Sequence, residues 1–382
     1  MKIVFASDIS FGFLGDRKIC YKSAMQEPAN VFKDADFSMV NLENVFGDEK
    51  DGEAIVKSGP NLISSDDCIE CIEALNPTVV GLANNHTNDY GENIMFHTMD
   101  MLKARNYQVI GAGKDIDQAY KPAYLEKDGI KVGVLAVCEN EFGGASDTKS
   151  GTAGYNLTRV TKGIRGIIKN QAKPVIYFHG GNESNPFPSP GKVELYRHFI
   201  DLGAEAVIAM HTHCPQGYEI YDGKPIVYSM GNFFFPIETP WSVSWSYGYM
   251  SMLDVSRDGV KFEPVSYKFD MQGIKILSGG EKEHFEKYLG VISEPIKNPE
   301  KLQNLFDSWC LTQGYFSLLS GYRDDLFSDG KTEEIKHIKN VFCCEAHNEL
   351  VKNTVSMIYE NRVEKARAGV QVIEKLKRLE ID

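Results

Sequence analysis

Side chains that can bind metals stand at the ends of five short apolar runs of this sequence. The runs are residues 2–7, 37–42, 78–83, 174–178 and 206–209, and the side chains that follow them are Asp8, Glu43, Asn85, His179, His211 and His213. Imidazoles, carboxylates and an amide oxygen together suit a borderline divalent cation such as Zn²⁺, Mn²⁺ or Fe²⁺. Two such cations about 3.5–4 Å apart, bridged by a carboxylate, clamp the attacking and leaving oxygens of a hydrolysis and acidify a water. The residue types therefore predict metal-assisted hydrolysis.

Each of these residues also has a purely structural alternative. Asp8 could cap the turn after its run, Glu43 could be a surface carboxylate, and Asn85 could satisfy turn backbone, as Asn often does. We favour ligation, because three histidines after two of the runs need a common reason. His86 adjoins a predicted ligand, and an imidazole beside such a site can protonate a leaving group. The alternative for His86 is a packed core histidine.

The remaining polar residues carry less information. Four of them could equally line a pocket or serve the fold, namely Asp16, Glu183, Gln216 and Asn232. Of these, Glu183 and Asn232 are predicted to bind substrate. The other histidines lie in helical patterns and receive no role: His97, His198, His284, His337 and His347.

An aromatic segment follows the last of these motifs. Phe233 and Phe235 alternate as in a buried strand, so we expect them in the core. Trp241 and Trp245 lie in a Ser-rich loop after Pro240, and such a loop could form a mobile wall of the cleft.

The elements that position these residues alternate between strands and helices over about the first 235 residues. Further strands are predicted at 108–111 and 132–138, and helices at 66–75, 94–105, 157–170 and 191–202. Asp-Gly pairs at 128–129, 222–223 and 258–259 predict three hairpins. In such α/β sheets the carboxyl ends of the strands form the ligand crevice, so residues far apart in sequence can converge there.

The last hundred residues have a helical character and little strand signal. Helices are predicted at 332–342 and 345–379, the latter with apolar residues at helical spacing. We therefore divide the chain into residues 1–275 and a helical extension, residues 276–382. The extension is expected to pack on the α/β body, and a protein partner bound through these helices is the alternative.

Composition argues against nucleic acid as a partner. The 382 residues carry a formal net charge of −12, whereas phosphate-driven binding needs clustered Lys and Arg. An anionic substrate, small or polymeric, remains possible because a metal cation can dominate the electrostatic field of one cleft.

No apolar run approaches the roughly 18–20 residues of a spanning helix, and the eight cysteines form no paired framework. We therefore expect a cytoplasmic chain with no membrane segment and with reduced thiols.

Longer motifs surround the predicted ligands. They are Ser7-Asp8-Ile9-Ser10-Phe11-Gly12, Asn41-Leu42-Glu43, Ala83-Asn84-Asn85-His86-Thr87-Asn88-Asp89-Tyr90-Gly91, His179-Gly180-Gly181-Asn182-Glu183, His211-Thr212-His213-Cys214-Pro215-Gln216-Gly217 and Ser229-Met230-Gly231-Asn232-Phe233. In this order and strand context the set resembles the CapA-type poly-γ-glutamate (capsule) biosynthesis proteins, a branch of the calcineurin-like metallophosphoesterase superfamily. The resemblance implies an α/β fold, a four-layer α/β/β/α metallophosphoesterase-like sandwich, here with a C-terminal helical elaboration.

The resemblance also implies roles for individual residues. The implied ligands are Asp8 and His213 for one metal ion, Asn85, His179 and His211 for a second, and Glu43 as the bridge between them. His86 would be the general acid, and Asp89 would orient it. The two divalent ions would be Mn, Zn or Fe.

The sequence departs from the family pattern at identifiable positions. The superfamily's first motif has a histidine where Ser10 stands, so we expect weaker binding of the metal at Asp8. Glu43 replaces the superfamily's bridging Asp, and both changes resemble the capsule branch. The fourth motif of that branch usually has Trp where this chain has Gly180. Capsule members are also often membrane-anchored, and this chain shows no anchor.

The combined prediction is a metal-dependent hydrolase that activates water at a dinuclear centre. One alternative is a non-hydrolytic subunit that binds a polymer or a partner during capsule assembly, supported by the weakened first motif. Another is an amide hydrolase that acts on γ-glutamyl linkages through the same centre.

Overall fold

The computed structural model describes residues 1–14, 21–313 and 332–381. Its larger sheet contains β1 (Lys2–Ile9), β2 (Phe37–Leu42), β5 (Val79–Gly81), β6 (Gln108–Ile110), β15 (Asn232–Phe234), β16 (Tyr247–Val255), β17 (Val260–Asp270) and β18 (Gly273–Ile276). The strand order is β18-β17-β16-β1-β2-β5-β6, and β15 also pairs with β1. The neighbours β1, β2, β5 and β6 are parallel, so their carboxyl ends share one edge of the sheet.

The second sheet contains β8 (Ala123–Lys127), β9 (Ile130–Cys138), β11 (Lys173–His179), β12 (Ala206–Met210), β13 (Tyr218–Tyr221) and β14 (Lys224–Val227). Its order is β13-β14-β12-β11-β9-β8, with β9, β11, β12 and β14 parallel. Short pairs join β3 (Val45–Phe46) to β4 (Ile63–Ser64) and β7 (Ala112–Gly113) to β10 (Gly151–Thr152).

The two sheets pack face to face, and alternating residues of β1 show how. Phe5 faces the second sheet, where its ring centroid lies 5.9 Å from that of Tyr177. The Tyr177 hydroxyl donates to the Ala6 carbonyl oxygen at 2.5 Å and so ties β11 to β1. Val4 and Ala6 point to the opposite face, into a separate apolar cluster with the helices. This period-two alternation places the sandwich core between the sheets.

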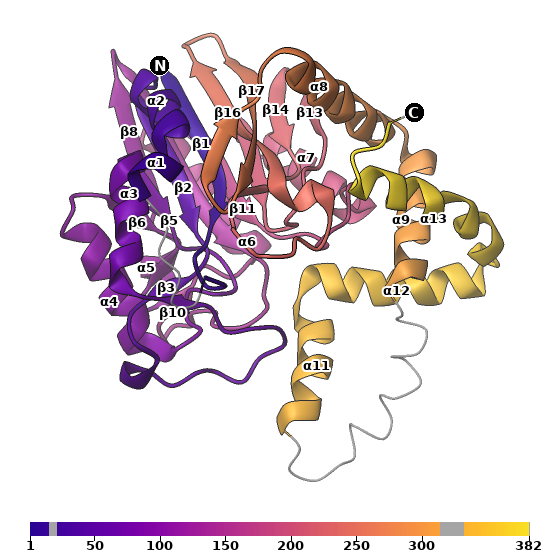
Figure 1. The fold of residues 1–382 in the computed structure, drawn as a ribbon, viewed down its shortest axis with the longest axis horizontal. Coiled ribbons are helices and arrows are strands. Elements are labelled where there is room, and N and C mark those ends of the chain that lie inside the picture. Colours follow the sequence, from indigo (N-terminus) through magenta and orange to yellow (C-terminus); the bar gives the residue numbers. More distant parts are fainter. Residues whose placement is uncertain (15–20, 314–331, 382) are drawn as a thin grey trace.

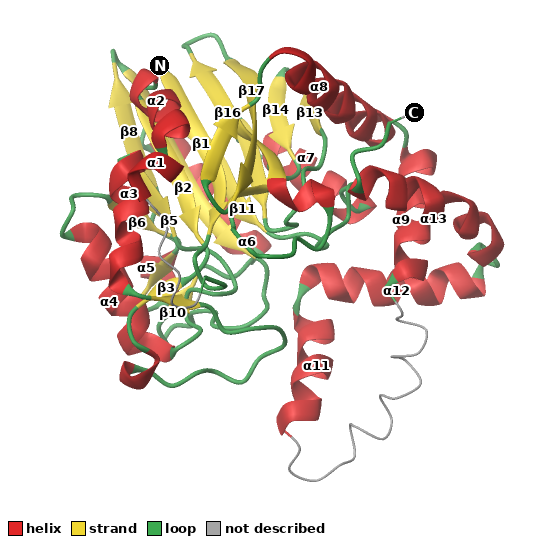
Figure 2. Ribbon diagram, in the orientation of Figure 1, coloured by secondary structure: helices red, strands yellow, loops and turns green. Residues whose placement is uncertain are grey.

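Helices cover both outer faces (Figures 1 and 2). On the larger sheet lie α1 (Tyr21–Ala24), α2 (Gln26–Asp34), α3 (Ile69–Leu75) and α4 (Gly91–Lys103), and on the second sheet α6 (Leu157–Lys169) and α7 (Pro190–Asp201). A short helix, α5 (Ile116–Ala119), connects β7 to β8. The layers are therefore α/β/β/α, which confirms the predicted fold class.

The C-terminal residues form α8 (Gly279–Ser293), α9 (Pro299–Thr312), α11 (Thr332–Cys343), α12 (Glu345–Tyr359) and α13 (Val363–Lys377). They lie together on one side of the sandwich (Figure 1) and share the core cluster of the second sheet through residues such as Phe285, Phe306 and Trp309. The single helix predicted over residues 345–379 is wrong. It breaks between α12 and α13, where Asn361 takes a left-handed backbone conformation with φ of +56°.

Most other predicted elements are confirmed. The three Asp-Gly hairpins form, and Asp128-Gly129 and Asp222-Gly223 take the positive φ angles of a type I′ turn. Several strand boundaries differ slightly: β1 continues to Ile9, so Asp8 lies inside it, and β11 continues to His179. The boundary between residues 1–275 and 276–382 stays a prediction. Among the helices that the structure describes, none combines the length and apolar character needed to cross a membrane.

Candidate metal centre

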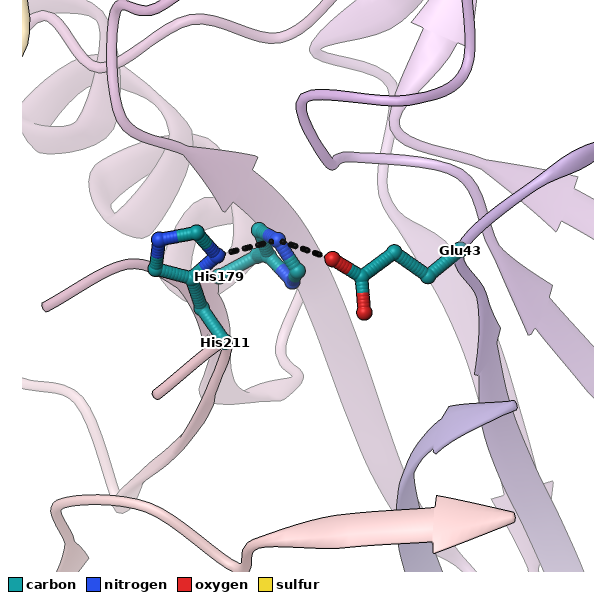
Figure 3. A group of neighbouring side chains, drawn as sticks. All are labelled: Glu43, His179 and His211. Carbon is teal, nitrogen blue, oxygen red and sulfur yellow. Dashed lines mark hydrogen bonds and ion pairs between the residues drawn. The ribbon is translucent and has the colours of Figure 1, made fainter. Parts of the chain in front are cut away.

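Three side chains from three strand ends form the centre of the site. His179 is the last residue of β11, His211 follows β12, and Glu43 follows β2. Figure 3 shows the imidazole of His179 between the other two: its Nε2 lies 2.9 Å from His211 Nδ1 and 3.4 Å from Glu43 Oε1. One donor atom from each of the three residues lies within 4.8 Å of the others. This spacing allows all three to bind one cation.

Asn85 and Asp8 extend the group on two sides of His179. Asn85 Oδ1 lies 3.0 Å from His179 Nε2, and Asp8 Oδ1 lies 3.3 Å from His179 Nδ1. Asn41, on β2, donates to the same Asp8 oxygen at 2.7 Å, while the backbone N–H of His211 donates to the other at 2.9 Å. Asp8 thus links β1, β2 and the loop after β12.

Glu43 is the residue that most needs a cation. Its side chain is fully buried, and neither carboxylate oxygen has a hydrogen-bond partner among the described residues. A buried carboxylate without hydrogen bonds is costly, and natural proteins pair such charges or use them to bind metals. The imidazolium form of His179 at 3.4 Å offsets part of this charge but makes no hydrogen bond to it. The residues present therefore fit a divalent metal ion.

The His-x-His segment is held in a strained backbone conformation. His211 has φ of +99° and His213 has φ of +55°, a region that non-glycine residues seldom adopt. Asp8 holds the first of them through its backbone N–H, and the N–H of Ser184 donates to the Thr212 carbonyl oxygen at 2.7 Å. Strain of this kind persists where surrounding contacts enforce it, and it concentrates at functional sites.

Charges within the group shift its pKa values in opposite directions. Burial disfavours the charged form of His179, yet the carboxylates of Glu43 and Asp8 outweigh burial and raise its pKa to about 10. Burial acts against ionised Asp8 as well, but the neighbouring imidazoles, His179 first, lower its pKa. Burial, together with the positive charge of His179 and His213, lowers the pKa of His211 well below its usual value. His211 is therefore a neutral imidazole, the form that binds metals.

His213 lies at the edge of this group, with its ring centroid 6.0 Å from that of His211. Its Nδ1 lies 2.8 Å from Asn232 Oδ1, and a hydrogen bond there leaves Nε2 free to bind a metal. Asn232 also donates through Nδ2 to the carbonyl oxygens of His213 and Trp245. The Asn232 side chain is fully buried, so in this structure it positions His213.

His86 and Asp89 form a hydrogen-bonded pair beside Asn85. His86 Nδ1 lies 2.7 Å from Asp89 Oδ2, an arrangement that leaves its Nε2 for a substrate. Sequence reasoning missed a third member, Lys57. Its buried ammonium group forms a salt bridge with Asp89 Oδ1 and donates to the Asn85 carbonyl oxygen at 3.1 Å. Lys57 lies in a loop without a strand-end signal, so no local pattern indicates it.

Two further carboxylates near the centre were also missed. Glu139 and Glu141 follow β9, so the same strand-end rule that indicated the other ligands would have found them. Glu141 Oε1 lies 3.5 Å from His211 Nε2. Burial, and then the charges of Glu183 and Glu139, raise the pKa of Glu141 to about 8. Glu139 forms an ion pair with Lys192 and accepts from the N–H of Gly181 at 3.2 Å.

Comparison with known proteins places this arrangement in a family. Residues 2–236 match the family model described as bacterial capsule synthesis protein PGA_cap. The chain belongs to this family. It is 27% identical over 210 residues to the capsule biosynthesis protein CapA of Bacillus anthracis and 27% identical over 237 residues to the PGA biosynthesis protein CapA of Bacillus subtilis. These alignments cover 53% and 60% of this chain, and 51% and 62% of the relatives, so the chain spans about half to three-fifths of their length.

Solved structures show more distant likenesses. The 5′-nucleotidase precursor of Thermus thermophilus is 13% identical with a TM-score of 0.38, covering 73% of this chain and 53% of that one. The 5′-nucleotidase of Candida albicans is 10% identical with a TM-score of 0.39, covering 79% of this chain and 56% of that one.

One departure from the capsule-branch motif has a structural reason. A Cβ atom at Gly180, where that branch usually has Trp, would lie 2.5 Å from Glu139 Cγ and 2.8 Å from a ring carbon of Phe178. The space beside His179 is therefore filled by Glu139. Ser10, the other departure, is buried, and its backbone N–H donates to the Phe234 carbonyl oxygen at 3.0 Å.

A cavity of about 580 Å³ opens at this centre. Of the predicted residues, those that line it are Asn85, His86, Glu183 and His211. His337 and His347, to which the sequence assigned no role, line it as well, because the C-terminal helices form its far side. Asp16 and Cys20 lie outside the described residues. The cysteines that the structure describes are all free thiols, as expected.

The predicted aromatic wall divides into two parts. Trp241 is 57% exposed and lines the cavity, as the hypothesis requires. Trp245 is buried, donates through Nε1 to the Phe235 carbonyl oxygen, and packs its ring 4.9 Å from His213. Trp245 therefore packs against His213, a predicted metal ligand, and helps to hold its ring in place. Phe233 and Phe235 lie in the core, which confirms that prediction.

Proposed function

We propose that this chain is a metal-dependent hydrolase that acts on an anionic ester in capsule or poly-γ-glutamate biosynthesis. The observation that carries the proposal is Glu43, whose two buried carboxylate oxygens have no hydrogen-bond partner among the described residues while the side chain lies beside His179 and His211. The link to poly-γ-glutamate comes from the family and from the names of the relatives in the two Bacillus species.

Two divalent cations, Mn, Zn or Fe, would be held by the implied ligands. Asn85, His179 and His211 would hold one, Asp8 and His213 the other, and Glu43 would contact both. Bound there, they would acidify a water and draw electron density from the electrophile.

The protein's own residues would supply orientation and the proton. His86 lines the cavity, and its hydrogen bond to Asp89 fixes the ring so that Nε2 can protonate the leaving group. Lys57 holds Asp89 through its other oxygen and also fixes the backbone of Asn85. The general acid and one metal ligand are thus oriented by the same ammonium group.

The test is turnover by purified protein supplied with Mn²⁺ or Zn²⁺. Phosphomonoesters, phosphodiesters and γ-glutamyl peptides serve as substrates, and a His211→Ala/His213→Ala variant serves as the control. Hydrolysis of an ester by the wild type and not by the variant supports the proposal. Hydrolysis of γ-glutamyl peptides alone would make the chain an amide hydrolase, and no metal-dependent turnover of any substrate would favour a binding subunit.

A further inference from the structure

Glu141 lies between two of the predicted metal ligands. Its Oε1 lies 3.5 Å from His211 Nε2, and its Oε2 accepts from Asn85 Nδ2 at 3.5 Å. Both contacts are longer than an ideal hydrogen bond, as contacts at functional sites often are before a ligand is bound. The side chain is only 9% exposed, so water competes weakly for its oxygens. One carboxylate therefore contacts His211, which follows β12, and Asn85, which follows β5.

The atoms that Glu141 contacts are those that a metal ion would leave unused. His211 Nδ1 faces the centre, 2.9 Å from His179 Nε2 (Figure 3), and Asn85 Oδ1 lies 3.0 Å from the same nitrogen. A neutral imidazole that binds a metal through Nδ1 carries its proton on Nε2, and this N–H faces Glu141 Oε1. An amide that binds a metal through Oδ1 directs its Nδ2 group elsewhere, here to Glu141 Oε2. Glu141 thus faces the outer side of two ligands predicted for the same ion.

An acceptor on the outer side of a ligand fixes the orientation of that ligand. Metal-binding histidines usually donate their second N–H to a carboxylate or a carbonyl group, which sets the tautomer and raises the basicity of the ligating nitrogen. For Asn85 the same contact selects the orientation of the amide, because an ionised carboxylate accepts only from Nδ2. Next to a bound divalent cation Glu141 should be ionised, since the charge of the ion lowers the pKa of a neighbouring acid.

The segment that carries Glu141 is fixed from its other side by the C-terminal helices. Asn140 donates through its backbone N–H and its side-chain amide to Glu345 of α12, at 2.9 and 2.7 Å. The Lys339 ammonium group of α11 donates to the Glu141 carbonyl oxygen at 3.2 Å and lies 4.4 Å from the ring centroid of Phe142. A group that positions a ligand must itself be held in place, and these contacts hold it. Both helices lie beyond residue 236, where the family match ends.

We propose that Glu141 is a positioning residue of the metal centre, which holds His211 and Asn85 in the orientation that binds one divalent ion. It accepts hydrogen bonds from these two ligands and is not itself a ligand. The inference rests on the metal centre of the proposed function. It concerns metal affinity, so its test does not require turnover.

The first measurement is the Kd for Zn²⁺, obtained by competition with a chromophoric chelator. Loss of the outer partner of a ligand weakens metal binding about 10- to 100-fold, so Glu141→Ala should raise the Kd by about this factor. Glu141→Gln keeps an oxygen that can accept from His211 Nε2 and should restore part of the affinity. The matched control is Glu183→Ala, which removes a carboxylate from the same cavity and so measures the effect of lost charge. The Kd of Glu141→Ala should exceed that of this control by about tenfold.

Two outcomes of this measurement overturn the inference. In one, Glu141→Ala weakens Zn²⁺ binding no more than Glu183→Ala does. In the other, Glu141→Gln binds Zn²⁺ as weakly as Glu141→Ala. Thermal melts of chelator-treated protein establish which variants are folded. If Glu141→Ala is not, Glu141→Gln is compared with Glu183→Gln and should bind Zn²⁺ more weakly, and equal Kd values would overturn the inference.

A crystal structure of the zinc-loaded wild type separates positioning from ligation. His211 Nδ1 and Asn85 Oδ1 should lie about 2.0–2.2 Å from the ion. The Glu141 oxygens should lie within about 3.2 Å of His211 Nε2 and Asn85 Nδ2. A Glu141 oxygen about 2.0–2.2 Å from the ion would make this residue a ligand and overturn the inference.

The inference and the proposed function can fail separately. Zinc binding that depends on Glu141, with no substrate hydrolysed, would contradict the hydrolase and support the inference. Metal-dependent hydrolysis with a Zn²⁺ Kd that Glu141→Ala leaves unchanged would do the reverse. A wild type that binds no Zn²⁺ would overturn both.

Discussion

Replacement of Glu43 by Gln tests the metal centre most directly. The substitution keeps the shape of the side chain and removes its charge. Glu43 is fully buried with two oxygens that make no hydrogen bond to the described residues, so its main interaction in the folded protein should be with bound metal. Glu43→Gln should therefore abolish the stabilisation that metal provides, while the protein without metal stays folded.

The expected magnitude follows from mass action. A ligand present at 100 times its Kd stabilises the folded state by about 2.7 kcal/mol. Unfolding entropy for a chain of 382 residues is about 0.8 kcal/mol/K, so this stabilisation raises Tm by about 3 °C. Without metal, the lost attraction to His179 and the relieved burial of a charge oppose one another. The variant without metal should then lose at most about 3–5 kcal/mol, the cost of removing one partner of a buried ion pair, because His179 keeps Asp8 as a second partner.

The assay is thermal unfolding of chelator-treated protein during titration with Mn²⁺, followed by elemental analysis after dialysis. Glu126→Gln, a charge-neutralising change on the exposed end of β8, is the matched control and should respond as the wild type does. The reasoning is refuted if Glu43→Gln retains both the metal-dependent rise in Tm and the wild-type metal content. One metal ion per wild-type chain, in place of two, would indicate that the site at Asp8 is the weaker one.

Three further changes probe other parts of the molecule. His86→Gln should lower kcat by about 10²–10⁴, the usual contribution of a general acid, with metal content unchanged by elemental analysis; a loss of bound metal instead would make His86 a ligand. Trp245→Ala should cost about 3–5 kcal/mol in denaturant unfolding because it empties a buried site, whereas Trp241→Ala should leave stability nearly unchanged and alter KM. Equal stability of the two variants would contradict their different burial. Tyr177→Phe removes the hydroxyl that donates to the Ala6 carbonyl oxygen between the sheets and should cost about 1–3 kcal/mol in the same assay, and no loss would show that this bond is replaceable.

Much of the site could be predicted because its residues follow a local rule. Each ligand candidate stands at or near the carboxyl end of a strand, and parallel strands bring those ends to one edge of a sheet. Glu43, His179 and His211 come from three such ends and lie within one cluster, although 168 positions separate the first from the last. Glu139 and Glu141 obey the same rule after β9, so the sequence carries the signal for them as well.

Other members of the site follow no such rule. Lys57 lies in an irregular loop, and only the packing of that loop against residues 85–89 makes it a partner of Asp89. Asn232, predicted to bind substrate, lies against His213 and is held there by hydrogen bonds to His213 and Trp245. Such hydrogen bonding depends on neighbours from several elements, which a motif does not encode.

The sequence by itself determined the α/β character, the hairpins and most of the candidate metal-binding side chains, since periodicity, turn residues and strand ends are local properties. Only the tertiary structure decided what the C-terminal helices do. His337 and His347 looked like ordinary helical histidines, and the long helix predicted over residues 345–379 gave no reason to break at Asn361. The position of these two histidines in the cavity wall depends on contacts such as that of Glu349 with Gly191, 158 residues away. Contacts over that separation arise from packing of whole elements, so residue order alone does not reveal them.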